Sequence, residues 1–191
     1  TNYIALRARK YDSLTRDFLE ENPDGWVVSL GCGFDTRYWR ITDRPLTYIE
    51  IDLPEVIDAK REILGKSPPY EMIGCSVMEK EWIGRIAAGR DERVLFLAEG
   101  LFMYLEENNA VGLFKVLAET FTGSLIVFEI VHQKYTKGLR KKMVEFRIGR
   151  GTGTAAGESY NYGLKDAKEI ESYSDNIRVL DEWSYFEDPD I

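Results

Sequence analysis

Residues 26–37 read Trp-Val-Val-Ser-Leu-Gly-Cys-Gly-Phe-Asp-Thr-Arg, an apolar run that passes directly into a turn with two glycines. The run at 26–30 predicts a short buried strand. Gly31 and Gly33 let the backbone turn sharply and approach a ligand that a Cβ would repel. The glycines alone fit an ordinary tight strand–helix turn equally well. Their position after a first strand is where α/β sheets bind ligands.

Apolar runs and helical patterns alternate on both sides of this turn. Further strands are predicted at 46–51, 70–73, 93–98 and 124–131, and helices at 3–21, 54–64, 79–88 and 106–120. Parallel neighbours need crossover connections, so this alternation predicts parallel pairing. Near-continuous apolar strands predict a sheet that is covered on both faces. We therefore predict an α/β fold, a doubly wound and mostly parallel sheet with helices on both faces.

The pattern changes after residue 131. We expect helices at 134–148 and 164–173, a glycine-rich loop at 149–163 and a late strand at 177–186. The segment 134–163 is expected to act as a lid over the acceptor site, because glycine-rich mobility suits closure over a substrate. Phe146, Tyr160 and Tyr162 would then wall an aromatic acceptor. The alternative is an ordinary surface insertion. The chain length predicts a single domain, residues 1–191.

Composition narrows the classes of partner. The formal net charge of −8 disfavours nucleic acid, which requires a basic patch. The basic cluster at 134–150 is interpreted as a solvated helix face. Cys32 and Cys75 are too few for a disulfide framework or a closed zinc site, so no metal is expected. No run approaches the roughly 18 apolar residues of a membrane span, and no signal peptide opens the chain. We expect a cytoplasmic protein with no nucleic-acid or membrane partner; its oligomeric state is open.

Acidic residues end the second predicted strand. Glu50 and Asp52 follow the glycines by about 20 residues, the spacing at which an acid binds ribose hydroxyls in nucleoside-binding sheets. Both lie on the same side of the strand, because side chains alternate. Asp52 alternatively caps the next helix. A dinucleotide site would have a third glycine where Thr36 stands, and Asp35 beside it suits a positively charged ligand. The combination indicates adenosine without phosphates.

Three strings together are diagnostic. They are the segment 27–37, Tyr48-Ile-Glu-Ile-Asp-Leu-Pro54 and Ala98-Glu-Gly-Leu-Phe-Met-Tyr-Leu105. In this combination the chain resembles the leucine carboxyl methyltransferase family, and within it the tetracenomycin-type polyketide O-methyltransferases. The resemblance runs from about Ile4 to Phe186. It implies the Rossmann-like fold of class I S-adenosylmethionine-dependent methyltransferases. The family usually closes with a seventh, antiparallel strand, so with one late strand we expect a chain cut short or an incomplete last hairpin.

The resemblance also implies a set of cofactor-binding residues. Arg7 matches the arginine that holds the methionine carboxylate, and Asp52 matches the acid that binds the ribose. Glu99 matches an acid that contacts the cofactor; the alternative is a buried, hydrogen-bonded carboxylate at a strand end. The remaining matches are the turn against the cofactor, Gly31, Cys32 and Gly33, and the pair beside the adenine, Ser76 and Val77, where the family usually has Asp-Leu.

Two residues are candidates for catalysis. Tyr104 matches a tyrosine at the mouth of the methyl-acceptor pocket, the alternative being a core aromatic residue. His132, the one histidine, follows the fifth predicted strand and is a candidate general base, or else a loop residue. A carboxylate acceptor is already ionised at neutral pH, whereas a phenol gains from a base.

Because no other base is evident, we predict an S-adenosylmethionine-dependent O-methyltransferase that acts on a carboxylate (or phenol) oxygen of a small, polyketide-like aromatic molecule. S-adenosylhomocysteine would be the product of the cofactor. The alternatives are a methyltransferase that acts on a protein C-terminal carboxylate, and a non-catalytic cofactor-binding or interaction protein of the same fold. A nicotinamide-dependent oxidoreductase is disfavoured by the missing third glycine.

Overall fold

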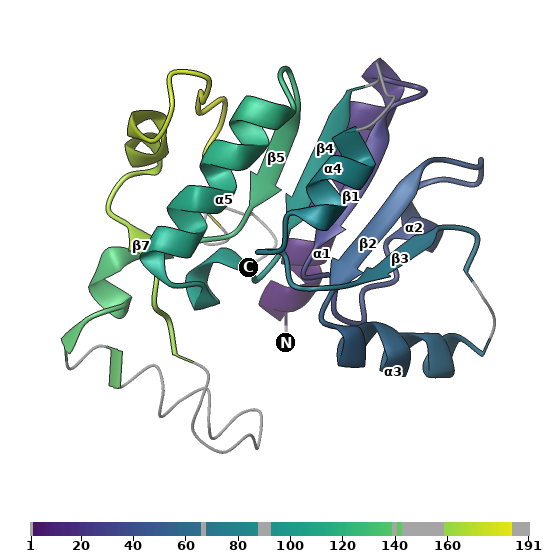
Figure 1. Cartoon of the computed structure of the whole chain (residues 1–191), viewed down its shortest axis with the longest axis horizontal. Helices are drawn as coiled ribbons and strands as arrows, with labels where there is room; N and C mark the ends of the chain where they lie inside the picture. Colours follow the sequence, from purple (N-terminus) through teal and green to yellow (C-terminus); the bar gives the residue numbers. More distant parts are fainter. Residues whose placement is uncertain (1, 66–67, 88–92, 139–140, 143–158, 185–191) are drawn as a thin grey trace. The chain divides into compact units, whose positions relative to one another are not determined.

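The computed structural model describes residues 2–65, 68–87, 93–138, 141–142 and 159–184 (Figure 1). Its main feature is a five-stranded sheet of order β3-β2-β1-β4-β5. The strands are β1 (Trp26–Leu30), β2 (Tyr48–Asp52), β3 (Glu71–Gly74), β4 (Val94–Ala98) and β5 (Leu125–Phe128). Strand β1 pairs in parallel with both β2 and β4, and β2 pairs in parallel with β3. The doubly wound parallel sheet is thereby confirmed.

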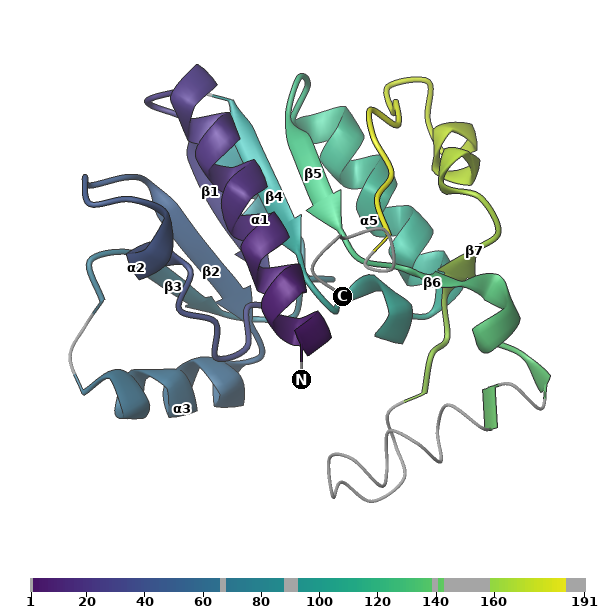
Figure 2. The same ribbon diagram turned by 180° about the vertical axis from the view of Figure 1, so that it is seen from behind.

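Helices lie on both faces of this sheet, as predicted (Figures 1 and 2). They are α1 (Asn2–Glu21), α2 (Tyr38–Ile41), α3 (Pro54–Leu64) and α4 (Glu81–Ala87). On one face, Tyr11 and Phe18 of α1 pack in one hydrophobic cluster with Leu95 of β4. On the other, the ring of Trp82 in α4 contacts Phe96, with ring centroids 6.4 Å apart. Since successive side chains of a strand alternate, β4 is buried on both sides.

The first two thirds of the chain follow the sequence pattern closely. Each predicted strand and helix up to residue 120 is present, and its ends lie within two residues of the expected ones. Pro54 begins α3 and Gly65 ends it in a left-handed conformation, φ 62°. The short helix α2 was not predicted. Among the described residues, none of the helices combines the length and the apolar character that a membrane crossing needs.

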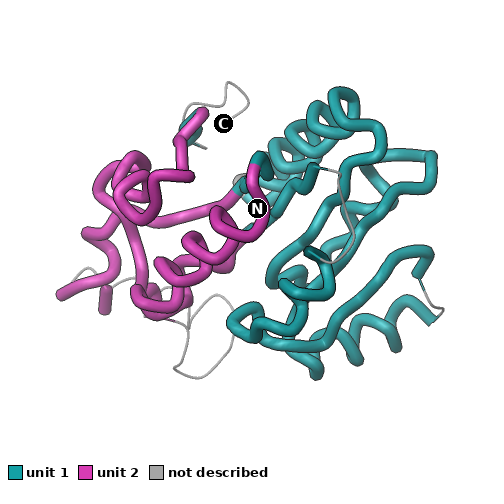
Figure 3. Tube along the Cα trace, turned by 45° about the horizontal axis from the view of Figure 1, so that its top comes forward, with its two compact units in different colours: residues 1–99, 123–127, 181–191 teal, residues 100–122, 128–180 magenta. Residues whose placement is uncertain are grey.

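The chain forms two compact units (Figure 3). Unit 1 comprises 1–99, 123–127 and 181–191, and unit 2 comprises 100–122 and 128–180. Unit 2 contains η1 (Phe102–Tyr104), α5 (Glu107–Thr120), β6 (Val131–His132), η2 (Gln133–Tyr135), β7 (Gly163–Leu164) and η3 (Ala167–Ser172). Its interior includes Phe102 stacked on Phe114, with centroids 4.2 Å apart. That residues 1–191 act as one methyltransferase domain stays a prediction.

The strand expected at 124–131 is two strands. β5 ends at Phe128, and Val131–His132 pairs with Gly163–Leu164 in a separate parallel sheet. Gly163 makes this pairing feasible, because a Cβ there would lie 2.6 Å from the carbonyl oxygen of Val131.

Two other expectations for the last third were wrong. The helix expected at 164–173 is a 3-10 helix, Ala167–Ser172, which begins at a capping box formed by Asp166 and Glu169. No strand forms at 177–184, the described part of the expected late strand. There the amide of Val179 donates to the Glu171 side chain instead of to a neighbouring strand. The expected helix at 134–148 and loop at 149–163 lie largely outside the described residues.

Candidate functional site

The predicted cofactor residues of unit 1 gather at the carboxyl edge of the sheet. The glycine turn follows β1, Asp52 ends β2 and Glu99 follows β4. Because β1 lies between β2 and β4, its turn lies between these two acids. The connections leave β1 toward opposite sides here, and this switch point is where open α/β sheets bind ligands.

The glycine turn and Asp52 form one hydrogen-bonded unit. Gly31 and Gly33 have φ of 62° and 49°, a left-handed conformation that disfavours other residues. The amide of Gly33 donates to Oδ2 of Asp52 at 2.7 Å, and the amide of Leu53 donates to Oδ1 at 2.8 Å. A Cβ on Gly33 would meet nothing within 4 Å, so the backbone conformation, and not packing, requires glycine there.

Asp52 keeps capacity for a ligand. A carboxylate has about four acceptor positions, and the two amides use only part of them. The alternative that Asp52 caps the following helix was wrong, because the N-cap of α3 is Leu53 and no side chain caps it. Large apolar side chains stand exposed beside the site: Phe34 in the turn, Leu53 after Asp52 and Met78 after Val77. A carboxylate that can accept hydrogen bonds from two hydroxyl groups, next to exposed apolar side chains, suits a nucleoside.

Ser76 and Val77 follow β3 and start next to Asp52, because the amide of Cys75 donates to the Asp52 carbonyl at 2.8 Å. The Ser76 hydroxyl accepts from the amide of Met78 at 3.2 Å and still has its own proton to donate. Val77 is buried, and its carbonyl accepts from the indole of Trp82. Of the pair, Ser76 retains a polar group that a ligand can use.

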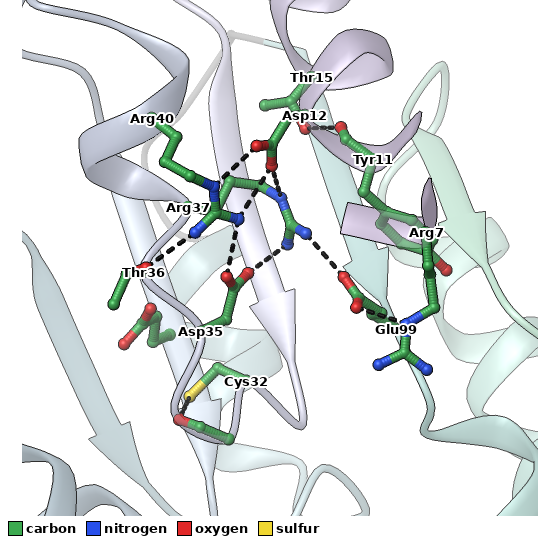
Figure 4. Close-up of polar contacts among 12 residues, drawn as sticks. Arg7, Tyr11, Asp12, Thr15, Cys32, Asp35, Thr36, Arg37, Arg40 and Glu99 are labelled. Carbon is green, nitrogen blue, oxygen red and sulfur yellow. Dashed lines mark hydrogen bonds and ion pairs between the residues drawn. The ribbon is translucent and has the colours of Figure 1, made fainter. Parts of the chain in front are cut away.

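A network of three arginines and three carboxylates holds the other side of the turn (Figure 4). Arg37, whose side chain is 1% exposed, contacts a different carboxylate with each nitrogen. These contacts are Nε with Asp12 at 2.8 Å, Nη1 with Asp35 at 2.5 Å and Nη2 with Glu99 at 2.6 Å. Burial lowers the pKa of Arg37, but the surrounding charges, Asp35 foremost, raise it above its ordinary value. The guanidinium therefore stays charged.

Arg7 and Arg40 complete the network. Arg7 Nε lies 2.6 Å from Oε1 of Glu99, and both side chains are about one-fifth exposed, 20% and 19%. Arg40 contacts Asp12 and Asp35 at 2.8 and 3.0 Å. The Glu99 carboxylate is therefore hydrogen-bonded, as the alternative expected, but only partly buried. Sequence reasoning missed Asp12, Arg37 and Arg40 as partners, because Asp12 and Glu99 reach Arg37 across 25 and 62 residues.

The side chains of Cys32 and Glu50 are both buried. Burial, and next the charge of Glu50, raise the pKa of the Cys32 thiol, so it stays neutral. Its sulfur donates to the carbonyl of Gly33 at 3.5 Å. Glu50, expected on the same side of the strand as Asp52, is fully buried and pairs with Lys60 of α3. Cys32 thus shapes the turn rather than reacting.

The remaining predicted residues belong to unit 2. Tyr104 is 39% exposed, so the alternative of a core aromatic was wrong. The centroid of its ring lies 5.6 Å from the ring centroid of Tyr160. Tyr162, by contrast, is buried with its hydroxyl 2.8 Å from that of Tyr173, and burial raises its pKa. Phe146 lies outside the described residues.

His132 is exposed at the end of β6. Its Nδ1 accepts from the backbone amide of Lys134 at 3.0 Å. The general-base role of His132 and the pocket role of Tyr104 stay predictions.

Residues 1–118 match the family model for leucine carboxyl methyltransferases. The chain belongs to the leucine carboxyl methyltransferase family. Among relatives, it is 28% identical to the tetracenomycin polyketide synthesis O-methyltransferase TcmP of Streptomyces glaucescens, over 97% of this chain and 66% of TcmP. It is 26% identical to leucine carboxyl methyltransferase 1 of Caenorhabditis elegans, over 60% of this chain and 45% of the relative. The chain thus spans less than two thirds of the length of these curated relatives.

Solved structures agree on the fold of this family member. Magnesium protoporphyrin IX methyltransferase from Synechocystis, solved with bound S-adenosylhomocysteine, aligns with a TM-score of 0.53 at 15% identity. The alignment covers 92% of this chain and 75% of that one. This likeness shows the Rossmann-like methyltransferase fold, in agreement with the family resemblance. The roles of the individual site residues of the family member stay predictions.

Proposed function

We propose that this protein binds S-adenosylmethionine at the carboxyl edge of β1, β2 and β4 and transfers its methyl group to an oxygen of a small molecule. One observation carries the proposal: an acid with spare acceptor capacity and an arginine–glutamate pair flank the same glycine turn. The first group suits the two hydroxyls of a ribose. The second suits an amino acid, whose carboxylate and ammonium complement an arginine and a glutamate.

Each group would then hold one part of the cofactor. Asp52 would accept from the ribose hydroxyls, Arg7 would bind the carboxylate and Glu99 the ammonium. Leu53, which is apolar and exposed just after β2, and Ser76, which follows β3, together suit the adenine. When bound, S-adenosylmethionine supplies a methyl group activated by its sulfonium. The protein contributes orientation and exclusion of water, the two effects that a simple displacement needs.

The same site disfavours a dinucleotide. A pyrophosphate binds at a helix N-terminus opened by glycine. Here the helix after the turn is the four-residue α2, and its N-cap is Arg37, whose guanidinium is occupied by three carboxylates. Asp35 and Asp52 add negative charge on either side of the turn. A nicotinamide-dependent reaction is therefore not proposed.

For the acceptor we propose a small aromatic carboxylic acid. A carboxylate is ionised at neutral pH and needs no base, which suits a site where His132 already uses Nδ1 to accept from the backbone. The exposed Tyr104 and the half-buried Tyr160 in unit 2 suit an aromatic molecule by stacking. The name of TcmP places that relative in polyketide synthesis, which agrees with this class. A phenol or a protein C-terminal carboxylate is an outcome that the acceptor screen distinguishes.

Calorimetric titration with S-adenosylmethionine, S-adenosylhomocysteine and NAD tests the cofactor. We expect micromolar binding of both adenosyl compounds, none of NAD, and loss of binding in Asp52→Ala. Asp58→Ala is the matched control, because Asp58 is an exposed carboxylate that pairs with Arg61 on α3. Absence of adenosyl binding by the wild type would refute the proposal. Binding without methylation of any carboxylic acid, phenol or C-terminal peptide would indicate the non-catalytic alternative.

A further inference from the structure

Glu99 lies between two arginines of different exposure (Figure 4). Its Oε2 contacts Arg37, which is 1% exposed, and its Oε1 contacts Arg7, which is 20% exposed. One oxygen of the carboxylate is therefore paired with a buried cation, while the other is paired with a partly exposed one.

Arg37 itself is held from three directions. Asp12 comes from α1, Asp35 from the glycine turn and Glu99 from the end of β4. A guanidinium is planar and presents its donors in a fixed fork, so three separate anchors leave it one orientation. Because Asp12 and Asp35 hold two of its nitrogens, the third is fixed for Glu99.

From this geometry we infer that Arg37 is a positioning residue, which orients Glu99 so that Oε1 is presented to the α-ammonium group of an amino-acid ligand. The inference rests on the proposed cofactor site and adds a specificity determinant to it. Without Arg37, Glu99 could turn both oxygens toward Arg7. Arginine and carboxylate form their strongest pair in this bidentate arrangement. Such a pair would compete with the carboxylate and the ammonium of the ligand alike.

A positioning role of Arg37 predicts a dependence on the chemistry of the ligand, whereas a purely structural role does not. Arg37 should matter for adenosyl compounds that carry an amino-acid portion and not for those that lack it. S-adenosylhomocysteine carries both the ammonium and the carboxylate. S-adenosyl-3-thiopropylamine carries the ammonium alone, and 5′-methylthioadenosine carries neither.

The test is calorimetric titration of these three ligands against the wild type and Arg37→Lys. Lysine keeps the charge but loses the fork that spans three carboxylates. We expect about tenfold weaker binding of S-adenosylhomocysteine and of the thiopropylamine, the size of one charged hydrogen bond. Binding of 5′-methylthioadenosine should stay within about twofold of the wild type. Equal weakening of all three ligands, or of none, would overturn the inference.

Two further variants, Arg40→Lys and Asp12→Asn, complete the test. Arg40→Lys is the matched control, because Arg40 contacts the same Asp12 and Asp35 without contacting Glu99. Its ratio of S-adenosylhomocysteine to 5′-methylthioadenosine affinity should equal that of the wild type, and a fall like that of Arg37→Lys would refute the role. If Arg37→Lys does not fold, Asp12→Asn removes one anchor and leaves both Arg37 and Glu99.

For Asp12→Asn we expect about threefold weaker binding of S-adenosylhomocysteine and of the thiopropylamine, with 5′-methylthioadenosine unchanged. A uniform loss over all ligands would again overturn the inference. Failure of the wild type to bind any of the three ligands is a different result, since it refutes the cofactor site itself.

Discussion

Glu50 of β2 and Lys60 of α3 form an ion pair at 2.8 Å in which neither side chain is more than 2% exposed. Glu50 stands two residues before Asp52 on β2, and the pair joins β2 to α3, the helix that follows it. Two charges removed from water gain little in net stability, but each depends strongly on the other. Burial raises the pKa of Glu50, and Lys60 opposes that rise.

Removal of Lys60 alone should therefore be costly. In Lys60→Met we expect a loss of about 3 kcal/mol or more in the free energy of unfolding, because Glu50 stays buried without its cation. The double variant Glu50→Met/Lys60→Met should recover to within about 1 kcal/mol of the wild type. Urea unfolding followed by circular dichroism measures both. A double variant no more stable than Lys60→Met would show that packing, and not charge, dominates.

The same pair gives a pH dependence with a definite sign. The pKa of Glu50 is raised in the folded state above its usual value of 4.5, so folding favours the protonated form. Its contribution to stability is full below pH 4.5 and is lost as the pH rises through the folded pKa. The stability gap between Lys60→Met and Glu50→Met/Lys60→Met should thus widen from pH 4.5 toward neutrality. Urea unfolding over this range checks it, and a gap that narrows would contradict the assignment.

Gly33 and Gly65 allow the glycine turn to be tested against a matched site. Both have left-handed backbones, and a Cβ on either meets nothing within 4 Å. Alanine should therefore cost about 1 kcal/mol of stability at each. Only Gly33→Ala should also weaken S-adenosylhomocysteine binding, since the Gly33 amide holds Asp52. Thermal unfolding and calorimetry separate the two effects; equal affinities in both variants would refute the role of the turn.

Tyr104 is expected to act on the acceptor and not on the cofactor. Tyr104→Ala should raise the KM of an aromatic acceptor about threefold to tenfold, the range of one aromatic contact. Tyr104→Phe should retain most of the wild-type KM, because stacking needs the ring and not the hydroxyl. Steady-state kinetics measures this, with Tyr135→Ala as control, since Tyr135 is a similarly exposed tyrosine of unit 2. An unchanged KM in Tyr104→Ala would exclude Tyr104 from the acceptor site.

His132 distinguishes the two acceptor chemistries. A general base contributes on the order of a hundredfold or more to kcat. With a carboxylic acid acceptor, His132→Gln should leave kcat unchanged, because the acceptor is already ionised. Glutamine also supplies an acceptor for the Lys134 amide that His132 now binds. With a phenol acceptor, a hundredfold loss of kcat that is restored at the alkaline pH where the phenol ionises would favour base-assisted transfer to a phenol.

Local patterns predicted most of the first 120 residues. Apolar runs marked β1 and β4, and Pro54 and Gly65 marked the ends of α3. These signals lie within one element, so they do not depend on the rest of the chain. The last third failed because its pairings are remote: β6 needs Gly163, more than 30 residues ahead, and Val179 uses the side chain of Glu171.

In the candidate site, too, local spacing along the chain was predictive, whereas contacts between residues remote in the chain were not predicted. Asp52 and the glycines were found because their spacing along the chain is informative. Glu50 shares that spacing, but its burial against Lys60 could not be predicted from the strand, because Lys60 comes from the next helix. Asp35, Arg37 and Glu99 stand in the diagnostic strings, but their pairing was not predicted, because the three carboxylates that contact Arg37 come from three separate segments.

The order of those segments along the chain bears on how a ribosome-bound chain acquires its buried charge. Asp12 and Asp35 are synthesised before Arg37, whereas Glu99 follows it by 62 residues. Strand β4, which pairs with β1 and precedes Glu99, also emerges after Arg37. Arg37 therefore has two carboxylates at hand while it is still in contact with water, before the sheet closes over it. The cation need never be desolvated alone during synthesis, and the residue that completes its enclosure is the one proposed to recognise the ligand.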